Sequence, residues 1–313
     1  MRCRKSIFAA IFVFVACVVF ADTKDTLTVA TWNIRNYLPV NRRIDGKFRP
    51  DYPKPEAEKA ALRAVIRQID ADVIALQEMG SGGHLAELQR DLESEGCVYP
   101  HAHVLAGADP VRQLAVLSRF PLREVREHSD MDFAYRDGRT SVSRGLLEVS
   151  VEAPGTGLGE GLSANRRVTL FVLHLKSRLT TFPDDPESAT WRAKEAEAVR
   201  NRVLQRFPNP AATGGGGGRF LIAGDCNDVV SSRPIRALLK RGNTEIARLL
   251  PATDSRGETW THYYAREETY SRVDNILVSP ALAAAVVRMW VVDSPDVLVA
   301  SDHRPVALEL RWK

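Results

Sequence analysis

The sequence contains little cysteine: four residues in a chain of 313. So few thiols exclude the dense disulfide framework that stabilises many small secreted domains. Cys3 and Cys17 lie close to the N-terminus, which leaves Cys97 and Cys226 for the rest of the chain. One bridge could join these two, but we expect two buried and unpaired thiols.

The chain also lacks an apolar run long enough to span a bilayer, which takes roughly 20 residues. Its longest uncharged apolar run, Ile7–Phe20, is shorter, follows several basic residues and ends just before Asp22. This arrangement predicts a signal peptide of residues 1–21, cleaved after Ala21, and a secreted or periplasmic protein without stable membrane association. A lipoprotein modified at Cys17 is a less favoured alternative, because the apolar run continues beyond that cysteine.

Neither sign of charge dominates the composition, with 43 lysine and arginine residues against 39 aspartate and glutamate residues. Part of this small excess lies in the predicted signal peptide, so the mature chain is close to neutral and has no global field for polyanions. Any basic binding surface must then be local. With 44% hydrophobic and 26% charged residues and no visible repeat, the sequence excludes disorder, collagen and coiled coil as its main character.

Short apolar, β-branched runs are the commonest feature of the rest of the chain. They are Leu27–Thr31, Val73–Leu76, Leu114–Leu117, Leu146–Val151, Val168–Leu173, Phe220–Ala223, Val273–Val278 and Val306–Leu310. Helical periodicity is rarer: apolar stripes run through residues 57–69 and 196–207, and two shorter candidates are Leu85–Leu92 and Ile235–Leu239. Many strands with few helices and short connections predict an α+β fold in which helices cover packed sheets.

Polar side chains with metal-ligating or phosphate-binding groups stand at the ends of these strands. They are Asn33, Glu78, His174, Asp225 and Asn227 after strands, and Asp274, Asp302 and His303 at or before strand starts. Taken singly, each is a common turn former or a solvated side chain. In a largely antiparallel sandwich, however, the starts of some strands and the ends of others share one rim. The whole set therefore predicts one site there, and its oxygen-rich chemistry favours Mg²⁺, Mn²⁺ or Ca²⁺ over structural zinc.

The segments around these residues form an ordered series of motifs. They are Thr-Trp-Asn-Ile-Arg-Asn (31–36), Asp-Ala-Asp-Val-Ile-Ala-Leu-Gln-Glu (70–78), Leu-Ala-Val-Leu-Ser-Arg-Phe-Pro (114–121), His-Leu-Lys-Ser (174–177), Gly-Asp-Cys-Asn-Asp (224–228), Arg-Val-Asp-Asn-Ile-Leu-Val-Ser (272–279) and Ser-Asp-His-Arg-Pro-Val (301–306). In content and order they resemble the motifs of the endonuclease/exonuclease/phosphatase superfamily. The resemblance implies that residues 22–313 form one domain, a four-layer α/β sandwich of two packed mixed β-sheets with helices on the outer faces. It also implies a divalent-metal phosphoesterase site at one edge.

The same resemblance implies a metal site with Glu78 as the principal ligand. Asn33 would lie beside it and hold the metal or a phosphate oxygen, and Asp302 would belong to the same site or to a second one. The cofactor would be Mg²⁺, with Mn²⁺ or Ca²⁺ as alternatives. It would act as a Lewis acid on the phosphate.

For the catalytic base, the resemblance implies a pair in which Asp274 orients His303, and His303 takes a proton from the attacking water. Asp225 and Asn227 would orient that water and the pentacovalent phosphate. His174 would donate a hydrogen bond or a proton to the phosphate. Hydrolysis would be direct, without a covalent enzyme intermediate.

Three basic residues are candidates for contacts with substrate phosphates. Lys176 is two residues beyond His174 and lies on the same side if the strand continues. Arg192 falls on the apolar stripe of its helix, where a phosphate contact and a structural ion pair are equally favoured. Arg144 stands near the proposed rim, although a role in surface solubility is also open.

Several substrate classes are compatible with such a catalytic core. Export and the His-Leu-Lys-Ser segment favour a phosphodiesterase that acts on nucleic acid, with DNA, RNA and the polarity of cleavage left open. A phosphomonoesterase is the first alternative. A sphingomyelinase-type enzyme is less favoured, because the loop candidate Gly155–Asn165 has no aromatic residue for contact with lipid. A non-catalytic binding module is the alternative from another class, and the oligomeric state is open.

Overall fold

The computed structural model describes residues 25–152, 167–180, 182–212 and 218–312. Two six-stranded sheets make up its centre, and both are mixed. The strands of the first, in spatial order, are β19 (Val286–Val291), β20 (Val306–Arg311), β1 (Thr26–Tyr37), β4 (Val73–Met79), β6 (Gln113–Ser118) and β5 (His101–Leu105). The strands of the second are β15 (Arg248–Leu249), β18 (Asp274–Val278), β12 (Phe220–Asp225), β11 (Arg167–His174), β10 (Leu146–Glu152) and β7 (Leu122–His128).

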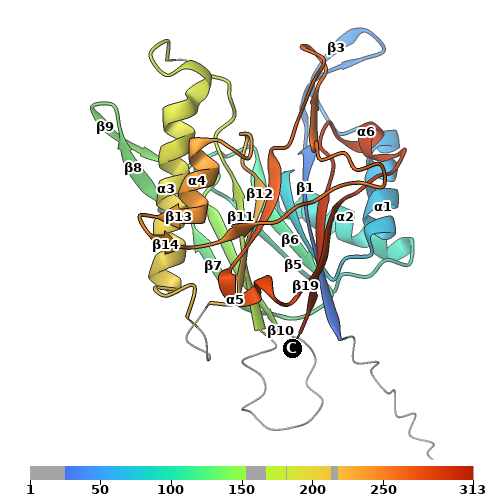
Figure 1. The fold of residues 1–313 in the computed structure, drawn as a ribbon. Helices are drawn as coiled ribbons and strands as arrows, with labels where there is room; N and C mark the ends of the chain where they lie inside the picture. The colour runs from blue at the N-terminus through green and yellow to red at the C-terminus, as the bar shows by residue number, and fades with distance from the viewer. Residues whose placement is uncertain (1–24, 153–166, 181, 213–217, 313) are drawn as a thin grey trace, which may run out of the picture.

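Helices cover the outer face of each sheet, so the molecule has four layers (Figure 1). On the first sheet they are α1 (Glu56–Ile69), α2 (Gly82–Ser94) and α6 (Val297–Ala300). On the second they are α3 (Ala189–Arg206) and α4 (Arg233–Leu239), preceded by the 3₁₀ turn η3 (Pro186–Ser188); α5 (Pro280–Ala283) is a single turn. The predicted four-layer sandwich is confirmed.

Three hydrophobic clusters hold these layers together. One lies between the sheets and includes Val29 and Val149; another lies under α1 and α2; the third lies under α3 and α4. Successive residues of β1 serve different clusters, since Val29 faces the other sheet and Ala30 faces the helices. This burial on both faces explains why the strands are continuous apolar runs rather than alternating ones.

The predicted helical stripes are confirmed, with one exception at an end. Residues of the first stripe from Ala61 to Ile69 are buried, whereas Ala57, in the first turn of α1, is exposed. Ala196, Val199 and Val203 of α3 are buried. Cys97 and Cys226 are buried and unbridged, as expected.

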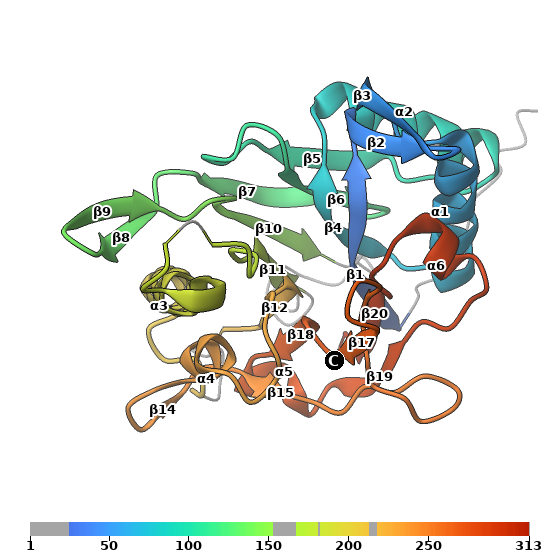
Figure 2. The ribbon, with the colours of Figure 1, turned by 90° about the horizontal axis from the view of Figure 1, so that it is seen from above.

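Four two-stranded hairpins project from this framework. They are β2 (Val40–Ile44) with β3 (Lys47–Tyr52), β8 (Asp132–Tyr135) with β9 (Gly138–Ser141), β13 (Lys240–Arg241) with β14 (Thr244–Glu245), and β16 (His262–Tyr264) with β17 (Thr269–Ser271). Seen from above, the β2–β3 and β8–β9 hairpins stand at opposite ends of the sandwich (Figure 2).

The predicted signal peptide and the loop candidate Gly155–Asn165 lie outside the described residues. Among the helices that are described, none is long and apolar enough to cross a membrane.

Candidate active site

A cleft of about 720 Å³ opens at the edge where β1, β4, β11 and β12 end. Because β18 runs antiparallel to β12, its first residue reaches the same edge, as the rule about strand ends predicts. The cleft is lined by most of the predicted site residues: Asn33, Glu78, Arg144, His174, Lys176, Asp225, Asn227 and His303.

Glu78 stands in an irregular stretch at the end of β4. The pairing of β4 with both neighbouring strands shifts register there, and Glu78 has a positive φ of 62°. Such a bulge re-aims a side chain out of the regular alternation, at the cost of local strain. The backbone N–H of Asn36, itself at φ 54°, donates to Glu78 Oε2 at 3.0 Å and holds the carboxylate in place.

Asn33 bridges the two sheets across the cleft. Its side-chain nitrogen donates to Asp225 Oδ2 at 3.0 Å and lies 3.4 Å from Glu78 Oε1. One amide therefore fixes the spacing of two carboxylates that come from different sheets. Asn227 is anchored separately: its backbone N–H donates to Asp225 Oδ1, and its side-chain amide donates to the carbonyl of Leu175.

His303 and Asp274 form a buried pair at the centre of the edge. His303 Nδ1 lies 2.9 Å from Asp274 Oδ2, while Nε2 lies 3.9 Å from Asp225 Oδ2. Burial lowers the pKa of His303, but the charges of Asp274 and Asp225 outweigh it and raise this pKa to about 10. Thr261 orients the other partner, because its hydroxyl oxygen accepts the backbone N–H of Asp274. The two carboxylates therefore stabilise the imidazolium, the form that His303 takes once it has accepted a proton.

His174 ends β11 beside Asp225, with Nε2 at 3.4 Å from Oδ2 of that carboxylate. Burial, and then the nearby Arg144 charge, holds the pKa of His174 well below its usual range. The ring is therefore neutral at physiological pH. A neutral imidazole can donate a single hydrogen bond to a phosphate, which fits the first of the two roles implied for this residue.

Arg144 and Lys176 line the cleft. The buried carboxylate of Glu195 accepts hydrogen bonds from the backbone at or next to both residues. Glu195 of α3 is fully buried; its Oε2 accepts the backbone N–H of Lys176 at 2.6 Å. Its Oε1 accepts the backbone N–H of Ser143 at 2.9 Å, next to Arg144. Arg144 is further held by Asp109, at 3.3 Å.

Arg192 does not line the cleft, and it forms a structural ion pair, which is one of the two roles left open for it. Its guanidinium is buried and donates to Asp228 through Nε at 3.0 Å and to the carbonyls of Lys176 and Glu187 through Nη1. Nη2 lies 2.9 Å from the same Asp228 carboxylate. The helical stripe correctly placed Arg192 on the buried face of α3. Its partner, Asp228, lies in the loop after β12, against which α3 packs.

Asp302 does not line the cleft that contains Glu78 and Asn33. It lines a neighbouring hollow of about 490 Å³, and its carboxylate is 3.5 Å from Arg35. Ligand atoms of His262, Asp302 and His303 lie within 4.8 Å of one another. A second metal in this hollow, on Asp302, stays a prediction.

Two residues of the site were missed in the sequence. His262 packs against His303, with ring centroids 4.4 Å apart and ring planes tilted by 34°, and Arg112 Nε lies 3.8 Å from Glu78 Oε1. Arg112 directly precedes β6, which runs antiparallel to β4, so the strand-end rule that located the other residues could also have found it. No comparable signal marks His262.

The donor set fits a hard divalent cation. Glu78 and Asp225 present carboxylate oxygens on either side of the Asn33 side-chain nitrogen. Oxygen ligands of this kind suit Mg²⁺, Mn²⁺ or Ca²⁺. The described residues around the cleft contain no cysteine cluster that would favour zinc.

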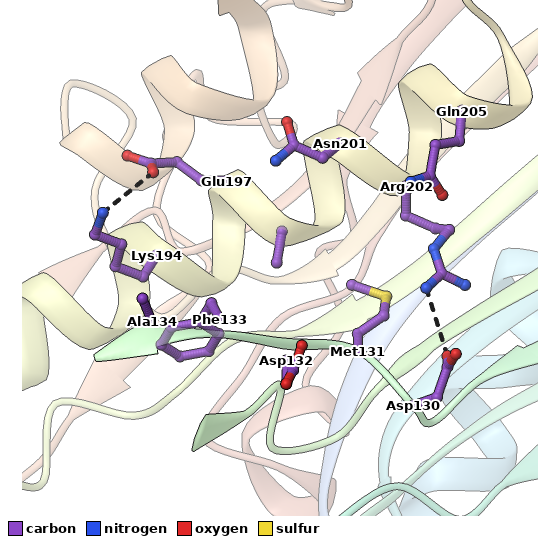
Figure 3. Close-up of a pocket in the computed structure, with 11 residues that line it drawn as sticks. Asp130, Met131, Asp132, Phe133, Ala134, Lys194, Glu197, Asn201, Arg202 and Gln205 are labelled. Atoms are coloured by element: carbon purple, nitrogen blue, oxygen red, sulfur yellow. Dashed lines mark hydrogen bonds and ion pairs between the residues drawn. The ribbon is translucent and has the colours of Figure 1, made fainter. Parts of the chain in front are cut away.

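A separate cleft of about 390 Å³ lies between β8 and α3 (Figure 3). Its charged side chains pair with one another: Lys194 with Glu197, and Arg202 with Asp130. None of the predicted site residues lines it. We therefore assign the chemistry to the cleft at the strand ends.

Comparison with known proteins gives a consistent result. The model of the Endonuclease/Exonuclease/phosphatase family matches residues 30–303. Among solved structures, the chain is similar to an endonuclease/exonuclease/phosphatase family protein from Bacteroides thetaiotaomicron, with 18% identity over 91% of this chain and 97% of that one and a TM-score of 0.58. It is also similar to the human nocturnin catalytic domain with bound sulfate (14% identity, 91% and 94% covered, TM-score 0.57). Sphingomyelinase C from Streptomyces griseocarneus is a third (16% identity, 92% and 100% covered, TM-score 0.57). At these identities, the structures show a shared fold. A search of curated proteins found no match.

Proposed function

The chain belongs to the endonuclease/exonuclease/phosphatase family, and on this premise we propose that it is a secreted nuclease that hydrolyses phosphodiester bonds of nucleic acid with Mg²⁺. At the level of the family, it is a metal-dependent phosphoric ester hydrolase. That assignment disfavours the non-catalytic binding module. The substrate, the metal and the export are our proposals.

The residues of the cleft divide the reaction between them. Glu78 and Asp225 would hold the divalent cation, and Asn33 beside them would keep the two carboxylates in place. The cation would supply Lewis acidity at the phosphate and offset charge on the leaving oxygen. His303 takes a proton from the attacking water, and Asp274 stabilises the resulting imidazolium. The neutral His174 donates a hydrogen bond to a phosphate oxygen.

The observation that carries the choice of nucleic acid is the group of cations around the cleft. Arg112, Arg144 and Lys176 line it together with the carboxylates and histidines. A polynucleotide presents further phosphates next to the one being cleaved, and each can meet one of these cations. A single phosphomonoester or a zwitterionic lipid headgroup offers no such array.

A panel of substrates tests the proposal. The mature chain with Mg²⁺ or Mn²⁺ is assayed against plasmid DNA, RNA, sphingomyelin and a phosphomonoester. We expect hydrolysis of a nucleic acid with kcat/KM well above the other values. Faster turnover of sphingomyelin or of the monoester would move the assignment to a lipid phosphodiesterase or a phosphatase.

Export rests on the sequence of residues 1–21. N-terminal sequencing of protein recovered outside the cytoplasm is expected to begin at Asp22. A lipid-modified chain that begins at Cys17 would establish the lipoprotein alternative, and a full-length cytoplasmic product would contradict both.

A further inference from the structure

The β2–β3 hairpin rises from the edge that carries the active site and has no covering layer (Figure 1). Every residue of β3 is exposed. At its tip, Asp45 and Gly46 both have positive φ, at 50° and 75°, as in the tight turns that join two antiparallel strands. A two-stranded hairpin is marginally stable in water by itself. Contacts with the rest of the protein must therefore stabilise the hairpin in this position.

Two cations fix the hairpin at its base. Arg42 donates to the carbonyl of Asn36 at 2.8 Å, and Asn36 is the residue whose backbone N–H positions Glu78. Lys54, just after β3, is buried and donates to the carbonyls of Arg35 at 3.2 Å and Ala300 at 2.7 Å. The hairpin is thus anchored to the same backbone segment that orients the metal-ligating carboxylate.

The exposed part of the hairpin carries cations that are not neutralised within the protein. Arg43, Lys47 and Arg49 are exposed and form no ion pair with the carboxylates of the described residues. The β8–β9 hairpin at the other end of the sandwich differs, since its Arg139 pairs with Asp132. The outer part of β2–β3 therefore carries three exposed cations that have no ion-pair partner among the described residues.

An aromatic ring lies between these cations. Phe48 is 62% exposed, and Arg43 is its direct cross-strand partner. Directly opposite residues of an antiparallel pair project from the same face. One face of the hairpin therefore presents a ring beside a guanidinium, and the other presents Lys47 and Arg49.

We propose that the two faces of this hairpin bind a polynucleotide as it leaves the active site: a base stacks on Phe48 with a phosphate against Arg43, and Lys47 and Arg49 on the opposite face contact phosphates of a neighbouring stretch of the same polynucleotide. The inference rests on the proposed nuclease function. From Val40 to Ile44, a strand covers about 13 Å, which equals the length of about four base pairs of B-form DNA. The hairpin can thus engage nucleotides beyond the one being cleaved.

A membrane is the other macromolecular surface that basic and aromatic residues can contact, and the hairpin suits it less well. Its tip, which would enter the bilayer first, carries the carboxylate of Asp45. Only one large apolar side chain of the hairpin, Phe48, is mostly exposed. Stacking on a base needs a single ring face, whereas stable membrane insertion needs a larger apolar area.

The first test compares Lys47→Ser/Arg49→Ser with Lys240→Ser/Arg241→Ser. The second pair removes the same charge from β13, a hairpin strand that is also fully exposed. For each variant, kcat/KM is measured with a 20-nucleotide substrate and with bis(4-nitrophenyl) phosphate, and the ratio of the two values is the readout. We expect the hairpin variant to lower this ratio about 10-fold at physiological salt and to make the slope against log[salt] shallower by about 1.4 to 1.8 units. The control should match the wild type.

The second test addresses the ring. Phe48→Ser is expected to lower the same ratio about fivefold or more. Phe48→Trp should keep the ratio near the wild-type value, because any aromatic ring at this position can stack on a base. A hairpin variant that matches the control overturns the inference and leaves the nuclease function intact. A wild-type chain that hydrolyses no polynucleotide overturns both. Binding to phosphatidylserine/phosphatidylcholine vesicles that Phe48→Ser abolishes, with unchanged polynucleotide kinetics, would assign the surface to lipid instead.

Discussion

Asp225 and Asp274 lie directly opposite each other in the antiparallel pair of β12 and β18. Like charges in that position destabilise a sheet. Burial, together with the charge of Asp274, raises the pKa of Asp225 to about 7. His303 offsets the repulsion, since it lies 2.9 Å from one carboxylate and 3.9 Å from the other. The three side chains therefore act as one unit, and a change in one alters the other two.

The first prediction concerns this unit. His303→Ala and Asp274→Asn are each expected to lower kcat by about 10² to 10⁴, the usual effect of losing a general base or its support. The double variant should be little slower than the slower single variant, because both substitutions remove the same step. Single-turnover rates with saturating Mg²⁺ measure this, and thermal unfolding checks the fold. Losses that add in log rate would show that the two residues act independently.

The second prediction concerns the metal. Glu78→Ala should weaken Mn²⁺ binding, measured by calorimetry, and abolish hydrolysis at ordinary Mg²⁺ concentrations, because it removes a carboxylate ligand. Glu93→Ala is the matched control, since Glu93 is an exposed glutamate on α2. Undiminished hydrolysis by metal-stripped enzyme in a chelator would contradict the mechanism.

The third prediction concerns the ion pair of Arg192. Arg192→Ala removes the closest charged partner of Asp228 and should lower the free energy of unfolding by about 3–5 kcal/mol, as measured in urea. Arg192→Met combined with Asp228→Leu should recover part of this loss, because no unpaired charge remains. If Arg192 contacted substrate instead, Arg192→Met would raise KM. The free energies of unfolding of Arg192→Ala and of the Arg192→Met/Asp228→Leu double variant would then stay near that of the wild type.

The fourth prediction concerns the dependence of stability on pH. Burial raises the pKa of Asp254, but the guanidinium of Arg304 and the N–H groups of Glu258 and Arg256 outweigh it and hold this pKa well below its usual range. Arg304 Nη2 lies 2.7 Å from Asp254 and is itself buried. A depressed carboxyl pKa stabilises the folded state above the unfolded value of about 3.9, and this contribution is lost as the pH falls below it.

Asp254→Asn should therefore destabilise the protein strongly at pH 7 and progressively less as the pH falls from about 5 towards 2. Urea unfolding at several pH values measures the difference from the wild type. Asp137→Asn, an exposed position in the turn between β8 and β9, is the control and should have little effect. A loss that is equal at all pH values would show that the ionised carboxylate is not the stabilising group.

The sequence by itself determined where the chemistry stands along the chain. Strands buried on both faces must be apolar throughout, so a polar residue such as Asn33 or His174 marks the point where a strand leaves the core. That rule located the candidate catalytic and metal-binding side chains that line the cleft, among them Glu78, Asp225 and His303. The sequence also placed Arg192 on the buried face of its helix, because the helical period of 3.6 residues can be recognised from neighbouring residues alone.

Only the tertiary structure decided what each of these side chains faces. Asp302 and His303 are neighbours in the chain, yet His303 Nδ1 lies 2.9 Å from Asp274 and the Asp302 carboxylate lies 3.5 Å from Arg35. The sequence places the two residues together but does not show which partner each one meets. The partner of Arg192 depends in the same way on how α3 packs against the loop after β12. Partners that are distant in sequence are set by the packing of layers, and no local pattern carries that information.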